Sequence, residues 1–95
     1  MNDIKLISTQ DMYEAAYYLT LGGNVESIEI VKENKKEICQ FIVSGENLYQ
    51  HQLDYFNAKA LVNLFDFRRC YLRLHSLIGT AKKEAKLKDR EEASL

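Results

Sequence analysis

The chain has 95 residues, 46% of them hydrophobic, and a formal net charge of −1 at pH 7. This length supports one hydrophobic core and leaves little room for a deep substrate cleft unless subunits pair. No run of about 18 apolar residues is present, and the N-terminal residues lack a basic or apolar leader segment. We therefore expect no membrane span and a cytoplasmic location.

The charge is distributed unevenly along the chain. Residues 1–60 carry five Lys/Arg against nine Asp/Glu, whereas residues 61–95 carry eight against five. The basic character belongs to the C-terminal segment, which is typical of a nucleic-acid or acidic-partner surface and equally of a solvated helix.

The N-terminal part of the chain predicts a strand followed by a helix. Residues 4–7 alternate imperfectly and indicate a short edge strand or an extended arm. Residues 8–11 place hydroxyl groups where they can accept from the first amides of a helix, and an acid follows in that turn. Gly22 and Gly23 predict the end of this helix. Its apolar positions are Met12, Ala15, Ala16 and Leu19.

The next segment predicts an antiparallel hairpin. Residues 25–32 and 37–43 are rich in β-branched side chains, and the polar residues 33–36 separate them. Both faces of the second strand are apolar, so we expect one face to meet the helices and the other to meet a partner or the N-terminal arm. The isoleucines expected at an uncovered interface are Ile28, Ile30, Ile38 and Ile42.

Two more helices are predicted after the hairpin. Residues 46–56 carry apolar side chains at helical spacing, and Asn63 can cap a last helix. We expect residues 79–80 to interrupt this helix, and residues 81–95 to form a charged, frayed extension of a single domain spanning residues 1–80. The predicted class is α+β, with a small antiparallel sheet packed by about three helices in the order [β]-α-β-β-α-α. The apolar stripe of the last helix is Phe67, Cys70, Tyr71, Leu74, Leu77 and Ile78.

The six tyrosines form a dense group for a chain of this length. Tyrosine is favoured at interfaces because its ring is apolar and its hydroxyl is polar; the alternative is that the rings fill the edge of the core with their hydroxyls in water. Tyr18 and Tyr55 lie off the main apolar stripes and are the better interface candidates.

The basic side chains of the last helix are a second candidate surface. Arg69 and Arg73 lie one turn apart, opposite the apolar stripe, where they could bind phosphates. The alternative is a solvated face with intrahelical ion pairs. The pI of about 6.1 favours that alternative, because a dedicated nucleic-acid binder usually has a high pI. The nucleic-acid candidates are Arg68, Arg69, Arg73, Lys82 and Lys83.

No catalytic or metal-binding constellation is evident. Cys39, His51, Cys70 and His75 lack zinc-ligand spacing, and the two cysteines are typical of reduced thiols in an apolar environment. No nucleophile has an adjacent base or a glycine-rich loop. We therefore expect no cofactor, no metal and no enzymatic activity, and a site assembled between subunits around the histidines is the least favoured class.

Two sequence patterns resemble a small domain family of unknown function that is scattered through bacterial and phage genomes. They are the Tyr-Ala-Ala helix within residues 8–19 (STQDMYEAAYYL) and the Asn-x-Lys-Ala-Leu-Val link within residues 55–62 (YFNAKALV). The resemblance covers about residues 8–78 and implies the order helix, hairpin, helix, helix, with no assigned activity. It also implies a phage or mobile-element origin and, by analogy, a role as an accessory or inhibitor protein.

These observations predict a non-enzymatic module that binds a protein partner, or a second copy of itself as a homodimer, through exposed tyrosines and an apolar face of the hairpin. The alternative is a nucleic-acid-binding accessory protein that lays its basic last helix along a phosphate backbone.

Overall fold

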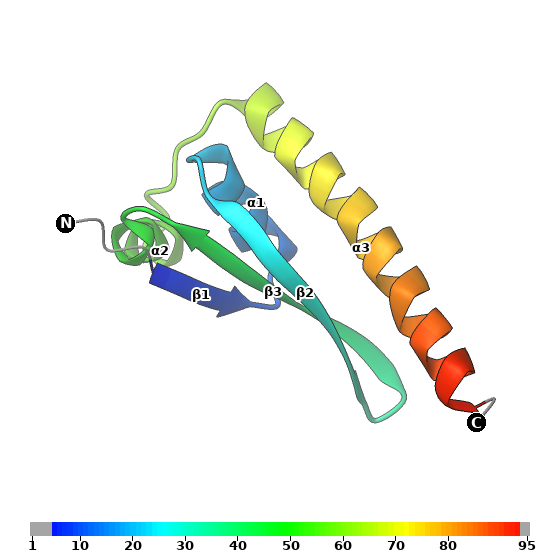
Figure 1. Cartoon of the computed structure of the whole chain (residues 1–95). Helices are drawn as coiled ribbons and strands as arrows, with labels where there is room; N and C mark the ends of the chain where they lie inside the picture. The colour runs from blue at the N-terminus through cyan, green and yellow to red at the C-terminus, as the bar shows by residue number, and fades with distance from the viewer. Residues whose placement is uncertain (1–4, 94–95) are drawn as a thin grey trace.

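The computed structural model describes residues 5–93, and the side chains of residues 5–88. Within this range three strands and three helices follow one another in the order β-α-β-β-α-α, so the predicted α+β class is confirmed (Figure 1). The elements are β1 (Lys5–Thr9), α1 (Met12–Thr20), β2 (Asn24–Glu33), β3 (Lys36–Gly45), α2 (Leu48–Phe56) and α3 (Leu64–Ala93).

The sheet has the strand order β1-β3-β2, with β3 antiparallel to both neighbours. The N-terminal segment is therefore an edge strand, one of the two alternatives that the sequence left open. Asn34 and Lys35 join β2 to β3 and both have positive φ angles, 50° and 67°. Two left-handed residues in a two-residue loop match the right-handed twist of the strands, which explains the tight hairpin.

The N-cap of α1 is Asp11, two residues after Thr9 and three after Ser8, the hydroxyl residues that the sequence suggested for this role. The Asp11 carboxylate accepts from the amides of Tyr13 and Glu14, while the Thr9 hydroxyl accepts from the amide of Asp11 itself. A carboxylate is an equally good cap and also interacts favourably with the helix dipole. The helix ends as predicted, because Gly22 adopts a φ of +94°.

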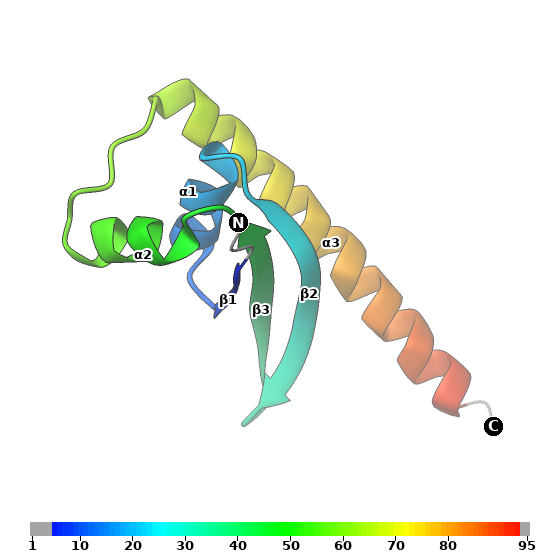
Figure 2. The same ribbon diagram turned by 60° about the vertical axis from the view of Figure 1, so that its left-hand side comes forward.

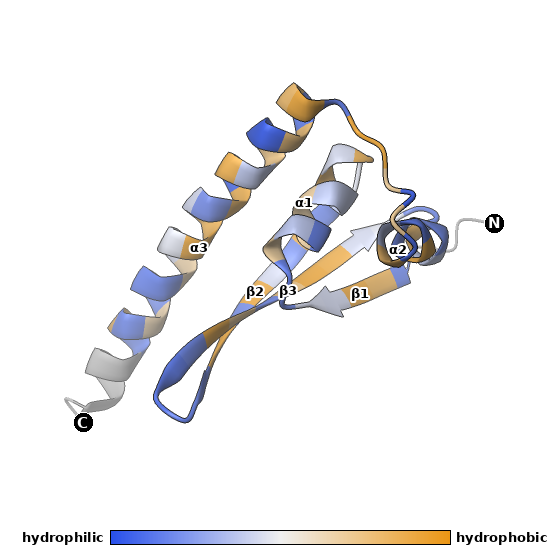
Figure 3. Cartoon of the chain, turned by 180° about the vertical axis from the view of Figure 1, so that it is seen from behind, coloured by the Kyte–Doolittle hydropathy of each residue, from blue (hydrophilic) through white to orange (hydrophobic). Residues whose placement is uncertain are grey.

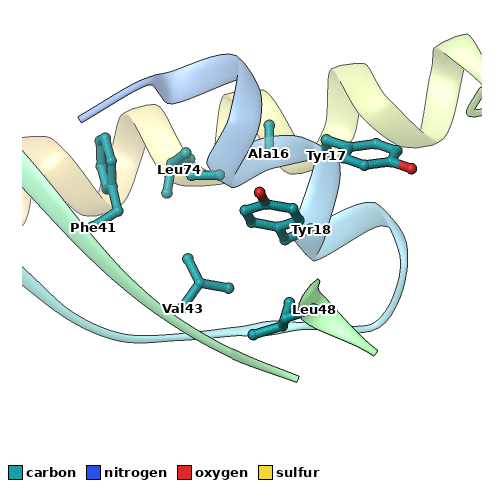
Figure 4. Packing of buried hydrophobic residues seen from close by; sticks show 8 residues of the cluster. Ala16, Tyr17, Tyr18, Phe41, Val43, Leu48 and Leu74 are labelled. Atoms are coloured by element: carbon teal, nitrogen blue, oxygen red, sulfur yellow. The ribbon is translucent and has the colours of Figure 1, made fainter. Parts of the chain in front are cut away.

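Helices α1 and α3 pack on one face of the sheet, and α2 lies beside α1 near the start of β1 (Figures 1 and 2). The core lies between them (Figure 4). Ala15 and Ala16 are fully buried, and their small side chains let α1 approach the sheet and α3 closely. The buried apolar residues are Ala15, Ala16, Tyr17, Tyr18, Phe41, Val43, Leu48 and Leu74.

Helix α3 begins at the predicted cap, where the Asn63 side-chain oxygen accepts from the amides of Phe65 and Asp66 at 3.0 and 3.1 Å. It runs without interruption through Gly79, so the expected break at residues 79–80 is wrong. A single glycine costs a helix about 1 kcal/mol, which a helix of 30 residues tolerates. Despite its length, neither α3 nor another described helix is apolar enough to cross a bilayer.

Candidate functional site

An apolar groove opens where α1, α2, the start of α3 and the linker between α2 and α3 (residues 57–63) meet. We refer to it as the aromatic groove; its volume is about 190 Å³. Pockets for small-molecule ligands usually measure about 300–1,000 Å³, so this groove suits one or two side chains of a protein better. Its lining residues are Tyr13, Tyr17, Tyr55, Ala60, Val62, Leu64 and Phe67.

Stacked rings form the walls of the aromatic groove. Tyr13 and Tyr17 lie one turn apart on α1 and therefore point to the same side. The Tyr17 ring stacks on Tyr55 of α2 with a centroid distance of 5.9 Å. The Tyr13 ring stacks on Tyr71 and Phe67 of α3 at 5.4 and 6.2 Å. These contacts fix the groove walls to three helices, so the groove is part of the fold.

The hydroxyl groups of the two tyrosines at the α1–α2 wall differ in their bonding. Tyr55 donates to Asp11 Oδ2 at 2.6 Å, and the pKa of Tyr55 is raised by burial and then by this hydrogen bond. Tyr17 is only 5% exposed, and its hydroxyl has no hydrogen-bond partner among the described residues. Burial, followed by the nearby Asp54, raises the pKa of Tyr17. The Tyr17 hydroxyl points away from the core and is free to bond to a partner (Figure 4).

Exposed apolar side chains surround the aromatic groove. Leu61 is 89% exposed, Leu64 72%, Phe65 71% and Phe56 65%. The part of the linker nearer to α3 and the first turn of α3 are mostly coloured as hydrophobic in Figure 3. Large contiguous apolar patches are rare on monomeric proteins and mark binding surfaces. We call these four side chains the apolar rim.

Residues 60–62 of the linker have an unpaired backbone, whereas the amides of residues 57–59 bond to carbonyl groups of α2. The side chains of Ala60 and Val62 are half-buried and face the groove, whereas Leu61 between them points outward. In the described chain, these three residues make no backbone hydrogen bond. An extended segment with free amides and carbonyls is available for pairing with another chain.

Tyr18 is not at the surface, so the expectation that it contributes to an interface is wrong. It is fully buried between α1 and the sheet, and its hydroxyl donates to Glu14 Oε2 at 2.6 Å. Glu14 also accepts from the Thr9 hydroxyl at 3.0 Å. A position off the main stripe of a short helix becomes buried here because neighbouring elements cover α1 on several sides. Tyr55, the other predicted tyrosine, does lie at the candidate site.

The four predicted isoleucines do not form one surface. Ile28 pairs with the buried Phe41, and Ile30 pairs with Cys39, so both lie on the face that meets the helices. Ile38 and Ile42 alternate with these residues and lie on the opposite face. All four are half-buried, and only the second pair is on the face that carries no helix (Figure 1).

The basic side chains are all exposed, but they are spread around α3. Arg69, Arg73 and Lys83 share one side, and Arg68 and Lys82 share another, because residues 4 or 14 positions apart return to nearly the same side of a helix. Lys82 also forms an ion pair with Glu37 of β3 at 3.7 Å. The five candidates therefore lie on two sides of α3, three on one and two on the other, and do not form a single stripe.

The described residues contain no group of three or more His, Cys, Asp or Glu side chains that could hold a metal ion. Cys39 and Cys70 are half-buried free thiols, and the ring of His51 lies edge-on to Tyr17 at 6.3 Å. The aromatic groove therefore offers a partner apolar contacts and hydrogen bonds.

The sequence interpretation missed Leu61, Leu64 and Phe65. A signal was present, because the run from Ala60 to Phe65, at the junction of the linker and α3, contains five apolar residues and only one polar residue, Asn63. Comparisons with protein-family models, with curated proteins and with solved structures find no match to this chain. The functional argument therefore rests on the geometry of the groove and its surroundings.

Proposed function

We propose that this protein is a non-enzymatic protein-interaction module that receives an apolar side chain of a protein partner in the aromatic groove. The observation that carries the proposal is the apolar rim, whose four side chains are each more than half exposed around a preformed aromatic groove. Interface centres are rich in aromatic residues because large rigid rings contribute much apolar area at low entropic cost.

The groove's polar groups support a protein ligand over a purely apolar one. Most of Tyr17 is buried, but its hydroxyl has no partner among the described residues and is accessible at the surface, so an incoming carbonyl oxygen could accept from it. A protein segment supplies both an apolar side chain and backbone carbonyls at fixed spacing. The accessory or inhibitor role implied by the family resemblance stays a prediction within this class.

Nucleic-acid binding is the less supported function. The five candidate cations of α3 are divided between two sides of the helix, three on one and two on the other, and one of them is paired with a carboxylate. Phosphate binding would need several cations along one line and would weaken steeply with salt.

Site-specific photo-cross-linking in the cells that encode the protein tests the proposed function. A photoreactive p-benzoylphenylalanine replaces Phe65 of the rim in one variant and Leu87 of α3 in the matched control; both positions are more than half exposed. We expect discrete protein adducts from position 65 and none, or far fewer, from position 87. Equal labelling at both positions, or no protein adduct at position 65, would contradict the proposal.

A further inference from the structure

The chain exposes more surface than a folded monomer of its mass normally does. Its accessible area is 7338 Å². Monomers of 11.1 kDa follow a mass relation that gives about 5,700 Å², so the excess is about 1,700 Å². The radius of gyration, 15.1 Å, likewise exceeds the value of about 12.4 Å for a compact chain of this length. A standard interface covers about 800 Å² per partner, so the excess of the whole chain, to which the projecting end of α3 also contributes (Figure 1), exceeds the area of one interface.

The surface around the aromatic groove is self-complementary in shape. A twofold dimer requires that one surface carry both a protrusion and a matching depression. Leu61 is the most exposed of the large apolar side chains, and it lies between Ala60 and Val62, which line the groove. The groove volume of about 190 Å³ can hold a leucine side chain. Protrusion and depression therefore come from the same linker.

The same surface is self-complementary in hydrogen bonding. The Tyr17 hydroxyl is an unused donor at the groove, and the carbonyl groups next to Leu61 make no backbone hydrogen bond in the described chain. When Leu61 of one copy enters the groove of another, its neighbouring carbonyls come close to that hydroxyl. Each copy then supplies the acceptor that the other lacks.

The charges near the groove permit two copies to meet there. The charged residues at this end of the molecule are Asp11, Asp54 and Asp66 together with Lys59 and Arg68, so both signs are present. Charge alone therefore does not oppose self-association there.

We propose that the occupant of the aromatic groove is a second copy of this chain, in a twofold dimer in which each Leu61 enters the groove of the other protomer. This inference rests on the proposed function, because it names the partner for the same surface. A second copy is also the partner that is always present when the chain folds, which suits a chain with so much permanently exposed apolar surface.

Sedimentation velocity over a range of concentrations tests the dimer. We expect the wild type to approach twice the mass of one chain as concentration rises. Leu61→Asp should weaken dimerisation at least about 100-fold, because two buried anchors are lost per dimer. The matched Leu87→Asp variant adds the same charge at an exposed leucine of α3 and should dimerise as the wild type does.

A second variant guards against an effect of misfolding. Tyr17→Phe keeps the stacked ring and removes only the hydroxyl, so dimerisation should weaken about 5- to 100-fold through the loss of two hydrogen bonds per dimer while the circular dichroism spectrum stays unchanged. A wild type that stays monomeric at every concentration overturns the dimer. Adducts at position 65 that contain a different protein would then still uphold the proposed function, whereas the absence of all adducts would overturn both.

Discussion

Tyr17 and Tyr18 are consecutive residues of α1, yet they face two regions of different character. Tyr18 lies in a sealed core with Phe41, Val43 and Leu48, where its hydroxyl is bonded to a buried carboxyl group. Tyr17 lies at the wall of the aromatic groove, where exposed apolar side chains surround its ring and its hydroxyl has no partner in the described chain. Two consecutive residues of the helix thus face a region with satisfied polar groups and a region with a donor that has no partner in the described chain.

The contrast between these two regions distinguishes residues that stabilise the fold from residues that are available for binding. In the sealed region, burial of apolar area and satisfied hydrogen bonds stabilise the folded chain. In the groove region, the ring of Tyr17 is buried, but the side chains of the apolar rim remain exposed and contribute little to the free energy of unfolding of a single chain. Substitutions in the two regions should therefore change different measurements.

The largest expected effect comes from a cavity in the sealed region. Phe41 is 1% exposed, so Phe41→Ala should lower the free energy of unfolding by about 3–5 kcal/mol. Leu61→Ala removes a side chain that is 89% exposed and should change the stability of the monomer by less than about 0.5 kcal/mol. Urea denaturation of both variants, at a concentration where the chain is monomeric, measures the two changes. Equal losses of unfolding free energy would contradict the distinction between the buried core and the groove region.

The second largest expected effect on stability comes from Glu14, whose carboxylate accepts hydrogen bonds from two hydroxyl groups. Glu14→Ala leaves the buried hydroxyls of Thr9 and Tyr18 without their acceptor and should cost about 2–4 kcal/mol. Asp11→Ala removes a cap and the exposed hydrogen bond to Tyr55, and should cost about 1 kcal/mol. Thermal and urea unfolding compare the two, and a larger loss for Asp11 would contradict the assignment of Glu14 to the sealed region.

An effect of pH follows from the buried phenol. Burial, and then the hydrogen bond to Glu14, raise the pKa of Tyr18 in the folded protein above its ordinary value of about 10. A raised pKa in the folded state stabilises the fold fully below pH 10 and loses that contribution as the pH rises above 10. Stability measured between pH 8 and 11 should therefore fall at the alkaline end, and Tyr18→Phe should make this fall shallower. If stability falls with pH as steeply in Tyr18→Phe as in the wild type, the predicted contribution of Tyr18 is contradicted.

The smallest expected effects come from two glycines. A Cβ at Gly79 would meet nothing within 4 Å, so Gly79→Ala should stabilise the chain by about 0.5–1 kcal/mol through the unfolded state. A Cβ at Gly23 would lie 2.9 Å from the Tyr18 carbonyl oxygen, so Gly23→Ala should be destabilising. The midpoints of urea denaturation show whether each substitution stabilises or destabilises the chain. If Gly79→Ala is destabilising, the prediction is contradicted and another part of the protein covers α3 at that position.

Much of the fold could be predicted from the sequence because its signals are local. The hairpin, the cap at Asn63 and the end of α1 at Gly22 depend on backbone preferences of a few adjacent residues. The uninterrupted α3 could not be predicted in this way. Whether one glycine ends a helix depends on the stability of the turns on both sides, which the residue itself does not encode.

The candidate site was predicted only in part, because it is assembled from distant segments. Tyr55 lines the candidate site, and its role at an interface stays a prediction, whereas Tyr18 is buried, since burial of a tyrosine on a short helix depends on what packs against it. The exposure of Leu61 depends on the path of the linker over α1. Hydrophobicity alone predicts burial for such a residue, and only the tertiary structure shows that nothing in the described chain covers it.

The contact between Leu61 of one copy and Tyr17 of another is the most direct test of this account. Isotope-filtered NOE spectroscopy on a mixture of labelled and unlabelled chains detects only contacts between different copies. We expect intermolecular NOEs from the Leu61 methyl groups to the ring protons of Tyr17 and Tyr55. Leu61 methyl groups that show no NOE to another copy, at concentrations where the chain sediments as a dimer, would contradict the proposed occupant of the groove.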